Sequence, residues 1–112
     1  MIIATTDYIA GKTIVRTLGV VRGNAVRARH VGMDLLAFLR NLVGGEVHEY
    51  VKLAAESREQ ALDRMVEEAE LLGANAVVGI RFSTAMIVSG AAELLAYGTA
   101  VIVEEQDEIT LS

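Results

Sequence analysis

The sequence predicts an α+β fold in which two strands are followed by two helices and then by two more strands. Three observations lead to this prediction. The segment from Glu46 to Leu72 has the apolar period of an amphipathic helix and ends at a glycine. β-branched runs with interior glycines lie on both sides of the helical part of the chain. The last two of these runs are separated by a short segment with serine and glycine, which is typical of a hairpin.

The first two strands are expected near the start of the chain. Met1 to Ala4 is a short apolar run, and its length favours a strand at the edge of a sheet. Thr13 to Val26 is β-branched and partly alternating, so we expect a strand with both faces at least partly covered. Gly19 and Gly23 interrupt this run and predict a bulge or a close approach of another backbone.

Two helices are expected in the middle of the chain. The segment Ala28 to Val43 has apolar residues at helical spacing, and Gly44 and Gly45 after it permit a sharp reversal. The long helix has an apolar stripe whose positions recur every three or four residues, and Arg58 occupies one of them. The stripe consists of Val51, Ala54, Arg58, Ala61, Met65, Ala69 and Leu72. The segment Ser57 to Gln60 fits a capping box, which would break the helix there. Because the stripe continues across that segment, we expect one continuous helix.

A hairpin is expected to end the domain. It consists of a strand from Asn75 to Met86, a loop from Val88 to Glu93 and a return strand from Leu94 to Glu104. Four alternate residues of the first strand are expected to share one face: Ala76, Val78, Ile80 and Phe82. We expect one domain over residues 1–105 and an acidic, flexible tail over residues 106–112.

Each of the three long strands contains an interior glycine. These are Gly19, Gly79 and Gly98. One interpretation is a crevice where a ligand or a neighbouring backbone approaches the sheet. The other, which we favour, is a bend or tight packing of the helix on the strands. None of the glycines belongs to a phosphate-binding fingerprint.

Composition predicts a homo-oligomer. The chain has 112 residues, of which 53% are hydrophobic, and a monomer of this size has too little interior to bury them all. The net charge is -5 and the ten basic residues are dispersed, which disfavours nucleic acid as a partner. The chain has neither an apolar run of the roughly 18 residues that a membrane helix needs nor a signal peptide, so we expect a cytoplasmic protein without a membrane partner.

Four segments resemble a known family in their order and spacing: TTDYIAGKTIVRTLGVVRGNAV, NLVGGEVHEY, SREQALDRMVEEAELLGANAVVGIRF and ELLAYGTAV. The family is the YbjQ-like or UPF0145 family of small bacterial and archaeal proteins, which carries a heavy-metal-binding label. The resemblance implies a small curved antiparallel sheet, with one short and one long helix packed on it, as in dodecin-like subunits. It also implies that copies of the chain assemble into a ring, a pentamer.

The residues available as metal ligands limit what that label implies. Soft metals favour thiolate and imidazole, and the chain has no cysteine, two histidines and four methionines. His30 and His48 are not spaced to share one ion. A divalent metal could still be held around an oligomer axis, with His48 beside Glu46 and Glu49 contributed by each copy. The alternative is that His48 is solvated in the first turn of the long helix.

Five polar residues in the matching segments are candidates for a ligand site or an interface: Arg40, Tyr50, Arg58, Glu93 and Tyr97. Arg58 lies in the apolar stripe and is expected to have an acidic partner, either Glu93 or Glu68. Such a pair would bind a ligand, or it would fix helix to sheet or one subunit to the next. Tyr97 is expected to pack its ring and present its hydroxyl to a cleft or interface.

Two functions remain open, and neither is enzymatic, because no catalytic constellation is visible in the sequence. In the first, the protein is an oligomeric module that holds a metal ion or a small anionic or apolar ligand at subunit boundaries or in the central opening. In the second, it is a structural or interaction ring with no dedicated ligand, and its polar residues pair among themselves.

Overall fold

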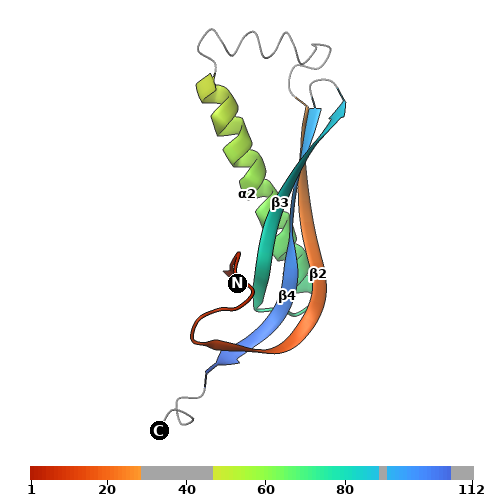
Figure 1. Ribbon diagram of the computed structural model, residues 1–112. Coiled ribbons are helices and arrows are strands. Elements are labelled where there is room, and N and C mark those ends of the chain that lie inside the picture. Colours follow the sequence, from red (N-terminus) through yellow and green to blue (C-terminus); the bar gives the residue numbers. More distant parts are fainter. Residues whose placement is uncertain (29–46, 89–90, 107–112) are drawn as a thin grey trace.

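The computed structural model describes residues 1–28, 47–88 and 91–106. Its elements, in chain order, are β1 (Ile2–Ile3), β2 (Lys12–Ala28), α2 (Val47–Leu71), β3 (Ala76–Val88) and β4 (Ala91–Glu105). The strands form one sheet in the order β1-β3-β4-β2, and α2 packs mainly on β2 and β4 (Figure 1). This is the expected α+β class. Of the short helix predicted from Ala28 to Val43 only Ala28 is described, and it ends β2; of the tail predicted over residues 106–112 only Gln106 is described.

The sheet is mixed, so the prediction of a wholly antiparallel sheet is wrong. β1 pairs with β3 in parallel, with Ile2 opposite Ala76 and Ile3 opposite Val77, whereas the β3–β4 and β4–β2 pairs are antiparallel. The reason is that β1 and β2 run in the same direction and residues 4–11 carry the chain from one edge of the sheet to the other (Figure 1). The edge position predicted for the first strand is confirmed.

The hairpin between β3 and β4 is tighter than predicted. Val88 pairs with Ala91, which leaves two residues between the strands in place of a loop from Val88 to Glu93. Connections of about this length are the commonest between antiparallel strands. The residues from Ala91 to Glu93, assigned to a loop by their composition, therefore continue the β4 ladder.

α2 is continuous over its 25 residues, which confirms the expectation that Ser57 does not break it. Ala61, Met65 and Ala69 are fully buried against the sheet. At Gly23 of β2 an added Cβ would lie 2.3 Å from the backbone nitrogen of Met65, so the helix rests directly on the strand backbone. In the described part of the chain no helix is both long and apolar enough to cross a membrane.

The buried side of α2 differs from the predicted stripe at two positions. Ser57 is only 6% exposed, whereas Arg58 is exposed to solvent. Leu72, expected at the end of the stripe, follows the helix and is 48% exposed. The physical reason is that the side facing the sheet follows a strict spacing of four residues from Ser57 to Ala69, and this places Arg58 beyond the contact. Arg58 is therefore not the buried charge that the sequence predicted.

A second, smaller core covers the opposite face of the sheet at its lower end. It contains Ala76, Val78, Val101 and Val103, with Ile9 from the crossing segment packed on them. Gly79 has a φ of 63° and the register shifts between Val78 and Arg81, which marks a bulge. The alternation therefore reverses there: Val78 belongs to this core and Ile80 to the core beneath α2. The prediction that they share a face is wrong.

The three strand glycines have two different roles. Gly19, with a φ of 126°, has no atom within 4 Å of an added Cβ and lies at a register shift of β2. It is a bulge, as Gly79 is. At Gly98 an added Cβ would lie 2.9 Å from the Val77 Cγ1 atom and 3.0 Å from the Val78 oxygen. Bends therefore explain Gly19 and Gly79. Gly98 is a close approach, but to the neighbouring strand β3 and not to the helix, so helix packing does not explain it.

Candidate functional site

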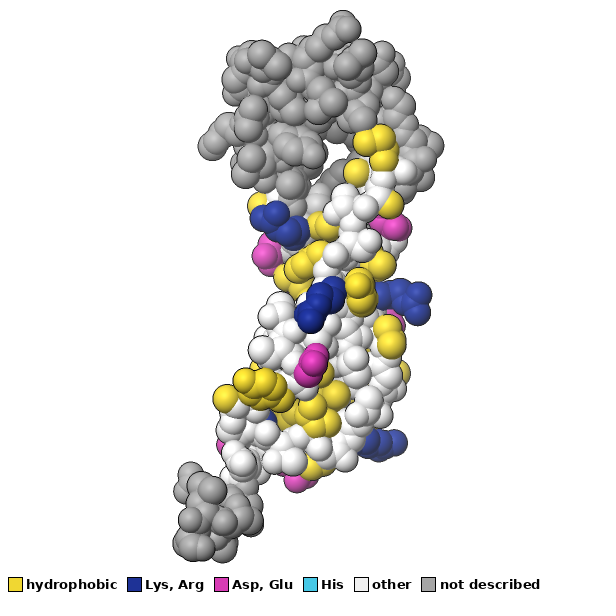
Figure 2. Space-filling view, viewed as in Figure 1, with side chains coloured by type: hydrophobic (Ala, Val, Ile, Leu, Met, Phe, Trp, Pro, Cys, Tyr) yellow, Lys and Arg dark blue, Asp and Glu magenta, His cyan; other side chains and the backbone are white. Residues whose placement is uncertain are grey.

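Above the Gly79 bulge, the sheet face opposite α2 carries a row of three long side chains. The register places Arg22 of β2 opposite Tyr97 of β4, and Tyr97 opposite Arg81 of β3. Residues in register across neighbouring strands share a face, so the three form one row. Both arginines are exposed and Tyr97 is 38% exposed. We call the face the open face and the three residues the arginine–tyrosine row. Figure 2 shows basic side chains on either side of hydrophobic ones at mid-height of the sheet.

Arg81 is fixed in place by the segment that crosses the sheet. Its Nη1 atom donates to the carbonyl oxygens of Thr5 and Ile80, each at 2.8 Å. Both bonds use the same nitrogen, so Nη2 and Nε still have donors available for a partner. The side chain therefore enters any interaction already partly ordered, which lowers the entropic cost of binding.

Glu93, four residues from Tyr97 along β4, has a partner on the open face. The Asn24 Nδ2 atom donates to the Glu93 Oε2 atom at 3.2 Å. Glu93 therefore does not pair with Arg58 within one copy, whereas a pair of Arg58 with Glu68 or a pair between copies stays a prediction. The physical reason is that Glu93 lies on the open face, in register with Val26, whereas α2 covers the other face of the sheet.

The edge of β2 is tied to the helix at the same level of the sheet. Arg64 of α2 donates from Nη1 to the Asn24 carbonyl oxygen at 2.5 Å. Asn24 therefore makes two contacts: its side chain donates to Glu93 on the open face, and its backbone carbonyl oxygen accepts from Arg64 of α2. This contact holds the strand that carries Arg22 against the helix, so the row is built on a supported strand.

The other predicted site residues divide into two groups. Arg40 and His30 lie outside the described residues. The backbone of His48 and Tyr50 belongs to the first turn of α2, at the end of the helix away from Gly73. Their roles as metal ligand and as ligand or interface residue stay predictions.

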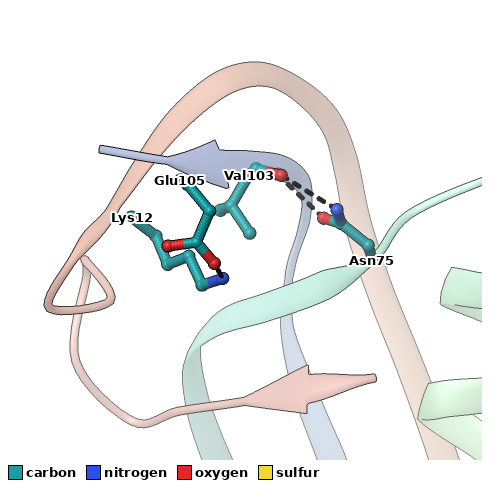
Figure 3. A network of polar contacts seen from close by, with 4 residues as sticks. All are labelled: Lys12, Asn75, Val103 and Glu105. Atoms are coloured by element: carbon teal, nitrogen blue, oxygen red, sulfur yellow. Dashed lines mark hydrogen bonds and ion pairs between the residues drawn. The ribbon is translucent and has the colours of Figure 1, made fainter. Parts of the chain in front are cut away.

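Polar contacts at the lower end of the sheet hold the fold together (Figure 3). The Asn75 side chain makes two bonds with Val103: Nδ2 donates to its oxygen at 2.9 Å, and Oδ1 accepts from its nitrogen at 2.8 Å. Lys12 and Glu105 form an ion pair nearby. The bonding role of Asn75 was not predicted from the sequence. The signal for it was a polar residue between the Gly73-Ala74 pair that ends the helix and the strand that follows.

Within residues 1–28, 47–88 and 91–106 no group of three or more His, Cys, Asp or Glu residues is arranged to hold a metal ion. A structural metal site needs about four such ligands at coordination distance. The described part of a single copy therefore does not fit a mononuclear metal centre.

The chain is similar to a known family over nearly its whole length. Residues 1–104 match the family model YbjQ_1, which is described as "Putative heavy-metal-binding". The chain is 59% identical to a UPF0145 protein of Methanosarcina acetivorans, over 90% of this chain and 95% of that one. It is 51% identical to one of Clostridioides difficile, over 97% of both chains. A crystal structure of a protein of unknown function from Pediococcus pentosaceus, which belongs to the DUF74 family, has the same fold. The TM-score is 0.65 and the sequence identity is 18%, over 93% of this chain and 98% of that one.

Proposed function

This chain belongs to the UPF0145 family, whose model is YbjQ_1, and from that membership we propose that it is a homo-oligomeric binding module without catalytic activity. Copies assemble into a ring in the cytoplasm, for which the family resemblance implies five subunits. The ring holds a metal ion or a small anionic or apolar ligand where copies meet.

The observation that carries this proposal is the surface that a single copy leaves exposed. In the described part of the chain, large hydrophobic side chains lie at the surface: Val20 is 62% exposed, Met86 60% and Leu71 88%. Scattered apolar residues are normal on a monomer, but these are large and join an already apolar sequence, of which 53% is hydrophobic. Covering them with another copy would stabilise the assembly.

The ligand is proposed to lie between copies because a single copy offers little enclosure. The arginine–tyrosine row supports an anionic group, since two guanidinium groups lie in one row on the open face. A metal ion would need ligands from several copies, and His48 is the residue we propose for that role. One histidine from each copy around a ring axis supplies the several ligands that a single subunit lacks.

The second candidate is a structural ring without a dedicated ligand. Two contacts favour it: Glu93 is bonded to Asn24, and Arg81 is bonded to two carbonyl oxygens. Polar residues that are satisfied within the subunit need no ligand. Arg22 favours the binding module, because in the described part of the chain it has no such contact.

The experiment measures oligomer mass by native mass spectrometry, and metal content by elemental mass spectrometry, on one unchelated, tag-free sample. We expect a multiple of the 12.0 kDa subunit, with metal at one per subunit or one per ring. His48→Ala should lose the metal, and the control His30→Ala should keep it. A ring that contains no metal and is stabilised by no divalent ion would exclude the metal and leave the structural ring or an organic ligand. A monomer would contradict both candidates.

A further inference from the structure

The outer side of α2 is acidic and uncovered. It carries five exposed carboxylates at spacings of three and four residues: Glu56, Glu59, Asp63, Glu67 and Glu70. That spacing places them along one side of a helix. With 100° per residue, they lie opposite the side on which Ala61, Met65 and Ala69 are buried. We call this surface the acidic helix face.

The open face of the sheet carries two guanidinium groups in one row. The charged residues around the row are Arg22, Arg81 and Glu93, with Glu93 already bonded to Asn24, and Asp7 of the crossing segment adds a carboxylate beside Gly79. The chain as a whole has a net charge of -5, so two arginines in one row are a local exception. Exposed hydrophobic side chains lie beside them, with Val20 and Val26 at 62% and 48%. A surface that is both cationic and apolar is suited to cover an amphipathic or acidic element.

We propose that the acidic helix face of one copy docks on the arginine–tyrosine row of a second copy. The inference rests on the proposed homo-oligomer and identifies the surfaces that meet in it. Neighbouring strands lie about 4.8 Å apart, so Arg22 and Arg81 are about 10 Å apart across β4. Asp63 and Glu70 are separated by about 10 Å along the helix axis, because each residue rises about 1.5 Å. Two carboxylates of the helix therefore match two guanidinium groups of the row, and Tyr97 packs between them.

The arrangement also completes the layers of the fold. A sheet is stable when both faces are covered, and α2 of its own chain covers only one. The docked helix covers the other face above the second core, which Ile9 already closes at the lower end. The two surfaces are different and lie on opposite sides of the subunit, so the contact is head-to-tail. Contacts of that kind propagate from copy to copy, and they form a ring when the rotation from one copy to the next closes and an open filament when it does not.

The test is a charge swap read out as oligomer mass by sedimentation at physiological salt. Arg22→Glu with Arg81→Glu should weaken assembly at least about tenfold, and so should Asp63→Arg with Glu70→Arg, because like charges then face each other. The quadruple variant has the net charge of the wild type and should regain its mass. A matched pair of single variants supplies the control: Arg22→Glu should weaken assembly, whereas Arg16→Glu, the same charge change on the same strand at an exposed position outside both surfaces, should keep the mass of the wild type. Circular dichroism checks that each variant is folded. Where an Arg→Glu variant is not folded, the corresponding Arg→Gln variant takes its place.

Three results would overturn the inference. In the first, both double variants keep the mass of the wild type. In the second, the quadruple variant stays dissociated although it is folded. In the third, assembly depends on Arg22 and Arg81 but not on the helix carboxylates, which would give the open face a different anionic partner. A wild type that is itself monomeric would instead contradict the proposed function, so the two failures can be told apart.

Discussion

The two faces of β2 show how one strand serves two purposes. On the face beneath α2 lie Val21, Gly23 and Ala25, all buried and all small enough for the helix to approach. On the other face lie Arg22, Asn24 and Val26, all exposed. Because side chains alternate along a strand, a change on one face leaves the other in place. The buried face determines the fold, and the exposed face is free to bind.

The largest effect is expected where the helix meets the buried face. Gly23→Val would place a side chain 2.3 Å from the Ala61 oxygen and the Met65 nitrogen, so α2 must move off the sheet. We expect a loss of about 3 kcal/mol or more in the free energy of unfolding, measured by chemical denaturation. The control Val20→Ala, on the open face, should lose less than about 1 kcal/mol. Equal losses would mean that the two faces do not differ in this way.

A smaller effect is expected at the lower end of the sheet, where both faces are covered. Asn75→Ala removes two bonds to Val103 and should cost about 1–3 kcal/mol, because the Val103 backbone groups lose their partners. Asn75→Asp keeps the acceptor for the Val103 nitrogen but turns a second oxygen toward the Val103 oxygen, so it should be no more stable than the alanine variant. An alanine variant as stable as the wild type would show that the β3–β4 ladder alone holds this end.

The smallest effect on folding is expected on the open face. Arg22→Gln should change the free energy of unfolding of one copy by less than about 0.5 kcal/mol, because the side chain is exposed. Thermal unfolding at a dilution where the wild type is monomeric measures this. A loss like that of Gly23→Val would make Arg22 part of the fold and remove the distinction between the faces.

Local pattern was sufficient to predict the helix and the long strands. The limits of α2 were predicted to within one residue at each end, since its apolar period and Gly73 are local signals. Its buried side was predicted less well, because Ser57 and Arg58 are neighbours and only the crossing of helix and sheet decides which of them faces the core.

Features that depend on register were beyond the sequence. Gly79 was visible as a strand glycine, but its bulge, which reverses the faces of β3, depends on how β3 pairs with β4. For the same reason Arg22 and Arg81, 59 positions apart by their numbers, could not be placed on either side of Tyr97. The parallel pairing of β1 likewise depends on the path of the crossing segment, not on composition.

The most direct test of the open face as a contact between copies is hydroxyl-radical footprinting of Tyr97 over a range of protein concentrations. In a single copy Tyr97 is 38% exposed and Tyr8 is 65% exposed, so Tyr8 serves as an internal reference. We expect Tyr97 to be protected at concentrations where the protein is oligomeric and to become reactive on dilution. A Tyr97 that keeps the same reactivity relative to Tyr8 at every concentration, while the oligomer forms, would contradict the account.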